Sequence, residues 1–103
     1  MLEQKGYSIL VRNWRYKNDE IDIVAQIAGI LIFVEVKTRS TSVFGSPEEA
    51  VGLAKQKKLV RAANFYIDEH DFIGEIRFDI VAIVLNDQEK DILHFEDAFF
   101  PKF

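Results

Sequence analysis

The sequence lacks several features that define common protein classes. It has no cysteine, which excludes disulfide bonds and thiolate metal sites and fits a cytoplasmic location. No apolar run approaches the roughly 18 residues of a membrane-spanning helix, so we expect no membrane partner. The first ten residues do not follow the pattern of a secretory signal, and there is no P-loop or dinucleotide fingerprint. The 103 residues suffice for one folded domain, predicted over residues 1–103.

An excess of positive charge is also missing, because the net charge is −4. This balance argues weakly against a nucleic-acid-binding protein, but the charge is unevenly distributed. Residues 1–61 contain ten Lys or Arg against seven Asp or Glu, whereas residues 62–103 contain three against ten. If acids of the first segment bound cations, that segment would present a positive surface to a polyanion.

Five segments have the apolar, β-branched and aromatic content of strands: 7–15, 20–27, 30–37, 77–85 and 91–100. Ala28-Gly29 lies between segments 20–27 and 30–37 and predicts a hairpin there. Residues 38–46 are polar and predict a loop. A helix is expected from Ser46, which forms a capping box with Glu49, to about residue 70. These elements predict an α/β fold with antiparallel strands first, then a helix crossover to a parallel strand.

The predicted hairpin places charged residues opposite one another. With a two-residue loop, Asp22 faces Glu35 and Glu20 faces Lys37, and all four project on one side of the sheet. Facing carboxylates repel each other, and a divalent cation such as Mg²⁺ or Mn²⁺ between them would remove the repulsion. Two alternatives stay open. The four residues could form a solvated surface, or a three-residue loop could send Asp22 and Glu35 to opposite faces.

The predicted helix carries Lys55 in the middle of its apolar face, with Gln56 beside it. A buried lysine is costly unless it meets carboxylates or a bound anion. We therefore expect Lys55 and Gln56 to reach the acids of the hairpin. The alternatives are a kink at Gly52, or a lysine whose ammonium group extends out to water.

The stretch from Asp22 to Glu35-Val36-Lys37 resembles the short motif of the PD-(D/E)XK nuclease superfamily. Longer segments make the resemblance more specific: EIDIVA, FVEVKTRS, FGSPEEAV, KQKKLVRAANFYI and RFDIVAIV. Together they are similar to the YraN-like family of small bacterial proteins, over nearly the whole chain. That family has a restriction-endonuclease-like fold related to archaeal Holliday-junction resolvases.

The resemblance implies a magnesium- or manganese-dependent nuclease acting on DNA. It implies that Asp22 and Glu35 bind the metal, with the Val36 carbonyl as a further ligand in our interpretation. Lys37 matches the catalytic lysine, and Glu20 matches an acidic position that would assist the metal. Lys55 and Gln56 match a helix pair that would contact the substrate or the attacking water.

The sequence departs from the family pattern in two places. Asp19 stands where the family usually has glycine. The family usually begins with an extra helix that contributes an acidic residue, and this chain starts near where that helix ends, at residues 2–7. We therefore expect the N-terminal helix to be largely missing and one sheet face to lack its cover.

Other residues are candidates for substrate or partner contacts. Arg12, Arg15 and Arg39 are candidates for contacts to backbone phosphates, with a solvated surface role as the alternative for each.

Cutting a junction symmetrically would require a homodimer. A non-catalytic nucleic-acid-binding module and a protein-interaction domain are the alternative functions. The latter would use an apolar patch in the tail DAFFPKF. Asp79 is predicted to anchor the sheet through an interaction with Arg77.

Overall fold

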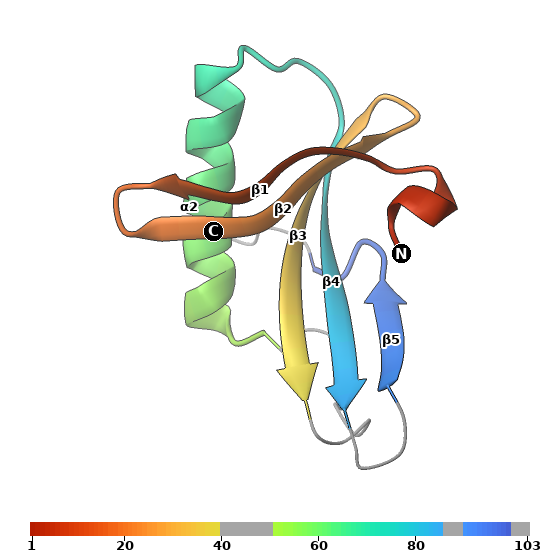
Figure 1. The fold of residues 1–103 in the computed structure, drawn as a ribbon. Coiled ribbons are helices and arrows are strands. Elements are labelled where there is room, and N and C mark those ends of the chain that lie inside the picture. The colour runs from red at the N-terminus through yellow and green to blue at the C-terminus, as the bar shows by residue number, and fades with distance from the viewer. Residues whose placement is uncertain (40–50, 86–89, 100–103) are drawn as a thin grey trace.

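The computed structural model describes residues 1–39, 51–85 and 90–99, which form one five-stranded sheet with an α-helix across one face (Figure 1). The strands lie side by side in chain order, β1-β2-β3-β4-β5. Their bounds are β1 Ser8–Tyr16, β2 Asp19–Ile27, β3 Ile30–Arg39, β4 Ile76–Leu85 and β5 Lys90–Phe95. The helix α2 spans Leu53–Glu69, and a 3-10 turn spans Glu3–Lys5.

The sheet is mixed, as the sequence predicts. β1 pairs with β2, and β2 with β3, in antiparallel fashion. β3 then runs parallel to β4, and β5 returns antiparallel to β4. Two predicted boundaries are wrong. β3 continues to Arg39, two residues into the predicted loop. β5 ends at Phe95, because Asp97 adopts a left-handed backbone conformation with φ 53° and turns the chain.

The β2–β3 hairpin has the predicted two-residue loop. Ala28 and Gly29 have φ values of 51° and 80°, the pair of positive angles that a tight hairpin turn of the right twist requires. The register runs from the pair Ile27–Ile30 to the pair Ile23–Val34. This confirms the predicted register as far as the pair Ile23–Val34 and excludes the three-residue loop. The predicted facing pair of Asp22 and Glu35 lies one step beyond the last pair of the ladder.

The start of the predicted helix is partly wrong. Val51 and Gly52 are not helical, and α2 begins at Leu53. Gly52 has an extended backbone with ψ 161°, so a continuous helix cannot pass through it. The predicted capping box of Ser46 and Glu49 lies outside the described residues. No helix of the described ranges has the length and hydropathy to span a bilayer.

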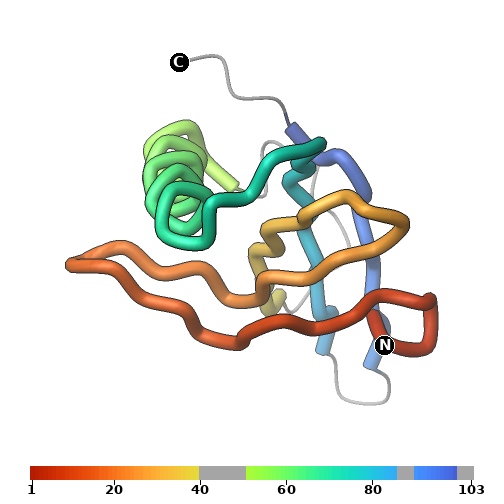
Figure 2. The backbone as a smooth tube through the Cα atoms, turned by 90° about the horizontal axis from the view of Figure 1, so that it is seen from above, coloured from red at the N-terminus to blue at the C-terminus, as the bar shows by residue number. Residues whose placement is uncertain are grey.

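The core lies on both faces of the sheet. The helix α2 lies over one face of the sheet (Figure 2). On that face, helix residues including Leu59 and Tyr66 pack against Phe33 and Phe78. On the opposite face, Leu2 and Tyr7 of the N-terminal segment pack on the strands with a second buried cluster. The first cluster holds α2 at a fixed position over β2, which is where the candidate site forms.

The tail residue Phe99 does not form the predicted surface patch. Its side chain is buried, and its ring stacks on Phe78 with centroids 5.1 Å apart. The Ala98 N–H also donates a hydrogen bond of 2.8 Å to the Phe78 carbonyl, which holds this segment against β4. Phe100 and Phe103 lie outside the described residues.

Candidate active site

Strands β2 and β3 separate at the position of the predicted acidic pair. Their backbone ladder ends at Ile23–Val34. Beyond that pair, the Val36 N–H donates a 2.8 Å hydrogen bond to Asp22 Oδ2. The Asp22 carboxylate thus occupies the place that a β2 carbonyl would take in a continued ladder. This carboxylate is held by β3 beside Glu35.

A backbone distortion in β1 lies across from Asp22. Asn13 has φ 53°, and in the β1–β2 register it stands between the pairs Arg12–Ile23 and Trp14–Ile21, opposite Asp22. A left-handed conformation costs a non-glycine residue about 1–2 kcal/mol, and asparagine tolerates it better than most. An open hollow of about 330 Å³, lined in part by Asn13 and Asp22, lies here. The sequence alone does not mark Asn13 as part of this region, because an asparagine within a strand is only a weak indication of a left-handed backbone conformation.

Glu35 is the least satisfied polar group of the described residues. Its side chain is 5% exposed, and Oε1 lies 3.8 Å from Lys37 Nζ and 3.7 Å from Lys55 Nζ. Its second oxygen, Oε2, is buried without a hydrogen-bond partner, the one such side-chain atom among the described residues. Burial and then the charge of Asp22 raise the pKa of Glu35, and the two lysines offset this only in part. The open alternative of a solvated surface is therefore wrong for Glu35.

These atoms fit a hard divalent cation. Among residues 1–39, 51–85 and 90–99, no three His, Cys, Asp or Glu side chains gather as a metal cluster. Asp22 and Glu35 as acidic donors to a metal stay a prediction. Mg²⁺ commonly binds through one or two carboxylates and completes its shell with water and phosphate oxygens. The unbonded Glu35 Oε2 is the atom that such an ion would satisfy. The Val36 carbonyl stays a predicted ligand.

The structure brings one of the other three predicted site residues, Lys55, Gln56 and Glu20, into contact with Glu35 and gives the other two different partners. Lys55 makes the expected contact with Glu35, although its role stays a prediction. Gln56 is buried and donates a 2.9 Å hydrogen bond to the Val51 carbonyl. The expectation that Glu20 faces Lys37 is wrong, because the ladder ends before that pair. Glu20 instead lies 3.4 Å from Arg15, across the β1–β2 pair.

The remaining predicted arginines lie at exposed or partly exposed positions. Arg12 Nη2 is 3.5 Å from Glu3 Oε1, and Arg39 Nη1 donates to the Thr38 carbonyl at 3.2 Å. Arg12 also lines the hollow beside Asp22. Contacts of these side chains to phosphates stay predictions.

Asp19, the residue that departs from the family pattern, ties β2 to α2. Its carboxylate accepts hydrogen bonds of 2.6 and 2.8 Å from Arg61 in a bidentate pair. The hydrogen bond from Arg61 is the main reason why the pKa of Asp19 is lowered. The pair holds the first residue of β2 against the helix that carries Lys55.

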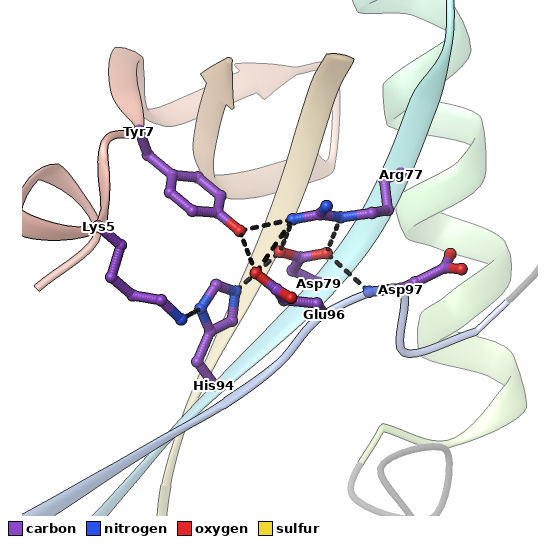
Figure 3. Close-up of polar contacts among 7 residues, drawn as sticks. All are labelled: Lys5, Tyr7, Arg77, Asp79, His94, Glu96 and Asp97. Atoms are coloured by element: carbon purple, nitrogen blue, oxygen red, sulfur yellow. Dashed lines mark hydrogen bonds and ion pairs between the residues drawn. The ribbon is translucent and has the colours of Figure 1, made fainter. Parts of the chain in front are cut away.

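A second polar cluster, centred on Asp79, connects β4, β5 and the N-terminal segment (Figure 3). Arg77 donates to both Asp79 oxygens at 2.8 and 2.9 Å, which confirms the predicted anchor. His94 Nε2 lies 2.8 Å from the same carboxylate, and the Asp97 N–H donates to it at 2.9 Å. Tyr7 accepts from Arg77 at 2.6 Å. We did not assign His94 a role from the sequence, since nothing in its neighbours marks the contact.

Glu35 and Asp79 therefore have opposite environments. Burial alone would raise the pKa of Asp79, but hydrogen bonds from Arg77, Asp97 and His94 outweigh it and lower that pKa. Glu35 has no such set of donors. The Asp79 cluster is satisfied by its own contacts and is structural, whereas Glu35 has an oxygen left for a ligand.

The strand order, the helix on one face and the separated strands with their acids are those of a restriction-endonuclease-like α/β fold. A family model described as "Uncharacterised protein family UPF0102" matches residues 1–83. A relative from Flavobacterium psychrophilum is 52% identical over 99 residues, covering 96% of this chain and 83% of the relative. Another UPF0102 protein, from Bacteroides thetaiotaomicron, is 45% identical over 100 residues, with 97% and 83% covered. The chain belongs to the UPF0102 family, which confirms the resemblance to the YraN-like proteins.

Proposed function

We propose that the protein is a metal-dependent nuclease that hydrolyses phosphodiester bonds in DNA. The observation that carries the proposal is the buried, unbonded Oε2 of Glu35, held beside Asp22 where β2 and β3 separate. A carboxylate in this state is costly to maintain. Binding of a cation during function would give a physical reason for keeping this buried carboxylate.

The side chains around the acids have complementary roles in this proposal. A bound Mg²⁺ would supply Lewis-acid activation of the phosphate and of a water molecule. Asp22 and Glu35 would hold the ion, and the hydrogen bond from the Val36 N–H orients Asp22. Lys37 Nζ, 3.8 Å from Glu35 Oε1, is placed to stabilise negative charge that develops on the phosphate oxygens. Lys55 adds a second positive charge from the helix side.

The proposal is tested by incubating plasmid and branched, duplex and single-stranded oligonucleotides with Mg²⁺ or Mn²⁺. We expect cleavage by the wild type and at least a hundredfold loss in Asp22→Asn and Lys37→Ala. Lys90→Ala, which changes an exposed lysine on β5 away from the acids, is the matched control and should keep full activity. Cleavage that is equal in wild type and Lys37→Ala would assign the activity to a contaminant.

A non-catalytic nucleic-acid-binding module is the second candidate, favoured by the acidic donor set of only two residues among those described. In that case the protein would bind DNA with an affinity independent of Asp22 and would show no cleavage with either metal. A melting experiment separates the two, since an ion that binds the native state raises Tm. The nuclease proposal requires a Mn²⁺-induced rise that Asp22→Asn abolishes.

A further inference from the structure

The tip of the β1–β2 hairpin lies beside α2 (Figure 2). Three aromatic side chains meet there. Tyr16 of β1 stacks on Phe65 of α2, with ring centroids 4.1 Å apart. Trp14 lies nearly parallel to Tyr16, at 6.3 Å and an interplanar angle of 11°. All three are only half-buried, so the rings are partly open to solvent. They are separate from the acidic pair and have no role in the chemistry proposed above.

The aromatic cluster borders two open hollows, both lined by Phe65. The larger, of about 480 Å³, is lined by Trp14, Arg15, Tyr16, Phe65, Asp68 and Glu69. The smaller, of about 220 Å³, is lined by Lys17, Asn18, Asp19, Arg61 and Phe65. An aromatic ring that is partly exposed and has open space beside it is a surface on which an unpaired base can stack.

Positive side chains surround the rings. Lys17 Nζ lies 5.5 Å from the Tyr16 ring centroid. The side chains of Arg15 and Arg61 are 74% and 59% exposed. The guanidinium of Arg61 uses its Nε and one Nη for Asp19 and carries further N–H groups that can donate to a phosphate. These cations match the charge of a nucleic-acid backbone.

Two acids define what can enter the larger hollow. Asp68 and Glu69 line it, and their charges disfavour a phosphate there. Carboxylates do, however, accept hydrogen bonds from the exocyclic amino groups of bases. The chemistry of this hollow therefore suits the base of a nucleotide, while the phosphates follow Arg15, Lys17 and Arg61.

The position of the cluster relates it to the acidic pair. Phe65 follows Lys55, the helix residue that contacts Glu35, by ten residues on α2, which corresponds to about 15 Å along the helix. One strand of DNA could thus extend from the acids to the aromatic cluster along α2.

We propose that the surface formed by Trp14, Tyr16 and Phe65 binds an unpaired base of single-stranded DNA, on the same strand as the phosphate at Asp22 and Glu35. The part of this proposal in which the bound strand continues to Asp22 and Glu35 rests on the proposed nuclease function. The binding of the base does not, since it needs neither metal nor hydrolysis. The substrate class is therefore DNA with an unpaired segment, rather than a continuous duplex.

The test measures binding in EDTA, where hydrolysis cannot interfere. A fluorescein-labelled single-stranded 12-mer and its duplex are titrated by anisotropy with wild type, Phe65→Leu and Phe72→Leu. Phe72 is a matched control, because it is also a half-buried phenylalanine but lines neither hollow. We expect tighter binding to the single strand than to the duplex, a five- to hundredfold loss for Phe65→Leu, and no change for Phe72→Leu.

Two further measurements keep the test independent of how well Phe65→Leu folds. Trp14 is the sole tryptophan of the chain, so its emission should be quenched when unlabelled single-stranded DNA saturates the wild type. Arg15→Gln, a change at an exposed side chain, should weaken single-strand binding without altering Tm. An unchanged Trp14 emission at saturation, or equal affinities of Phe65→Leu and Phe72→Leu, would overturn the proposal. Metal-dependent cleavage in the same preparation would show that the proposed function survives that result.

Discussion

Replacing Glu35 by glutamine should stabilise the metal-free protein, although Glu35 is buried. When Glu35 is ionised, the fold must hold a buried carboxylate whose Oε2 has no hydrogen bond, and burial and the neighbouring charge of Asp22 both raise its pKa. Glutamine keeps the shape and removes the charge. An unsatisfied buried polar group costs about 1–3 kcal/mol, and charged groups cost more. Because the amide of glutamine stays desolvated, we expect recovery of about 1 kcal/mol.

Asp79 provides the matched comparison, because Asp79→Asn makes the same chemical change at an equally buried acid. Asp79 has a fully buried side chain and accepts hydrogen bonds from Arg77, His94 and the Asp97 N–H. Breaking one partner of a buried charge pair costs about 3–5 kcal/mol. The two substitutions should therefore change stability in opposite directions.

The assay is thermal unfolding in EDTA at pH 7.5, followed by circular dichroism and repeated with urea. For a domain of this size, 1 kcal/mol corresponds to about 4–8 °C in Tm. We expect a rise of that order for Glu35→Gln and a larger fall for Asp79→Asn. If Glu35→Gln also lowered Tm, the contacts with Lys37 and Lys55 would be a sufficient buried salt bridge, and the reasoning that leads to a cation would fail.

Three further predictions concern the backbone and acid stability. Asn13→Gly should keep the Mn²⁺-induced rise in Tm, whereas Asn13→Val should reduce it. The reason is that valine adopts a φ of 53° poorly. Equal rises in Tm for the two variants would show that the backbone conformation of Asn13 does not matter for metal binding. Ala28→Asn should raise the free energy of unfolding by about 0.5–1 kcal/mol in urea, since asparagine favours the left-handed turn conformation. The lowered pKa of Asp79 gives stability that is present above its ordinary value of 3.8 and is lost as pH falls through the folded pKa. Acid unfolding of Asp79→Asn should therefore depend less on pH in that range.

The hairpin and its register could be predicted because local features determine them. Ala28-Gly29 between two apolar runs selects a two-residue turn, and the register then follows by counting. The contact of Lys55 with Glu35 could also be predicted, since an inward lysine needs a negative partner. Both expectations rest on neighbours in the chain or on the cost of burying charge.

Features that depend on long-range geometry could not be predicted. The prediction that Glu20 faces Lys37 is wrong. The sequence does not reveal that β2 pairs with β3 only from Ile23 onward. The role of His94 depends on its register with β4 and on the N-terminal segment, neither of which a lone histidine indicates. The burial of Phe99 depends likewise on a turn at Asp97 that brings the tail back to Phe78.

The position of a bound ion is the most direct measure of whether Asp22 and Glu35 act together. Crystals soaked in Mn²⁺ would be measured by anomalous diffraction, with crystals of Asp22→Asn as the control. We predict an anomalous peak at bonding distance from the Asp22 carboxylate and Glu35 Oε2 in the wild type and none in the variant. A wild-type map without a peak, in which Lys37 or Lys55 has moved onto Oε2 instead, would contradict the account.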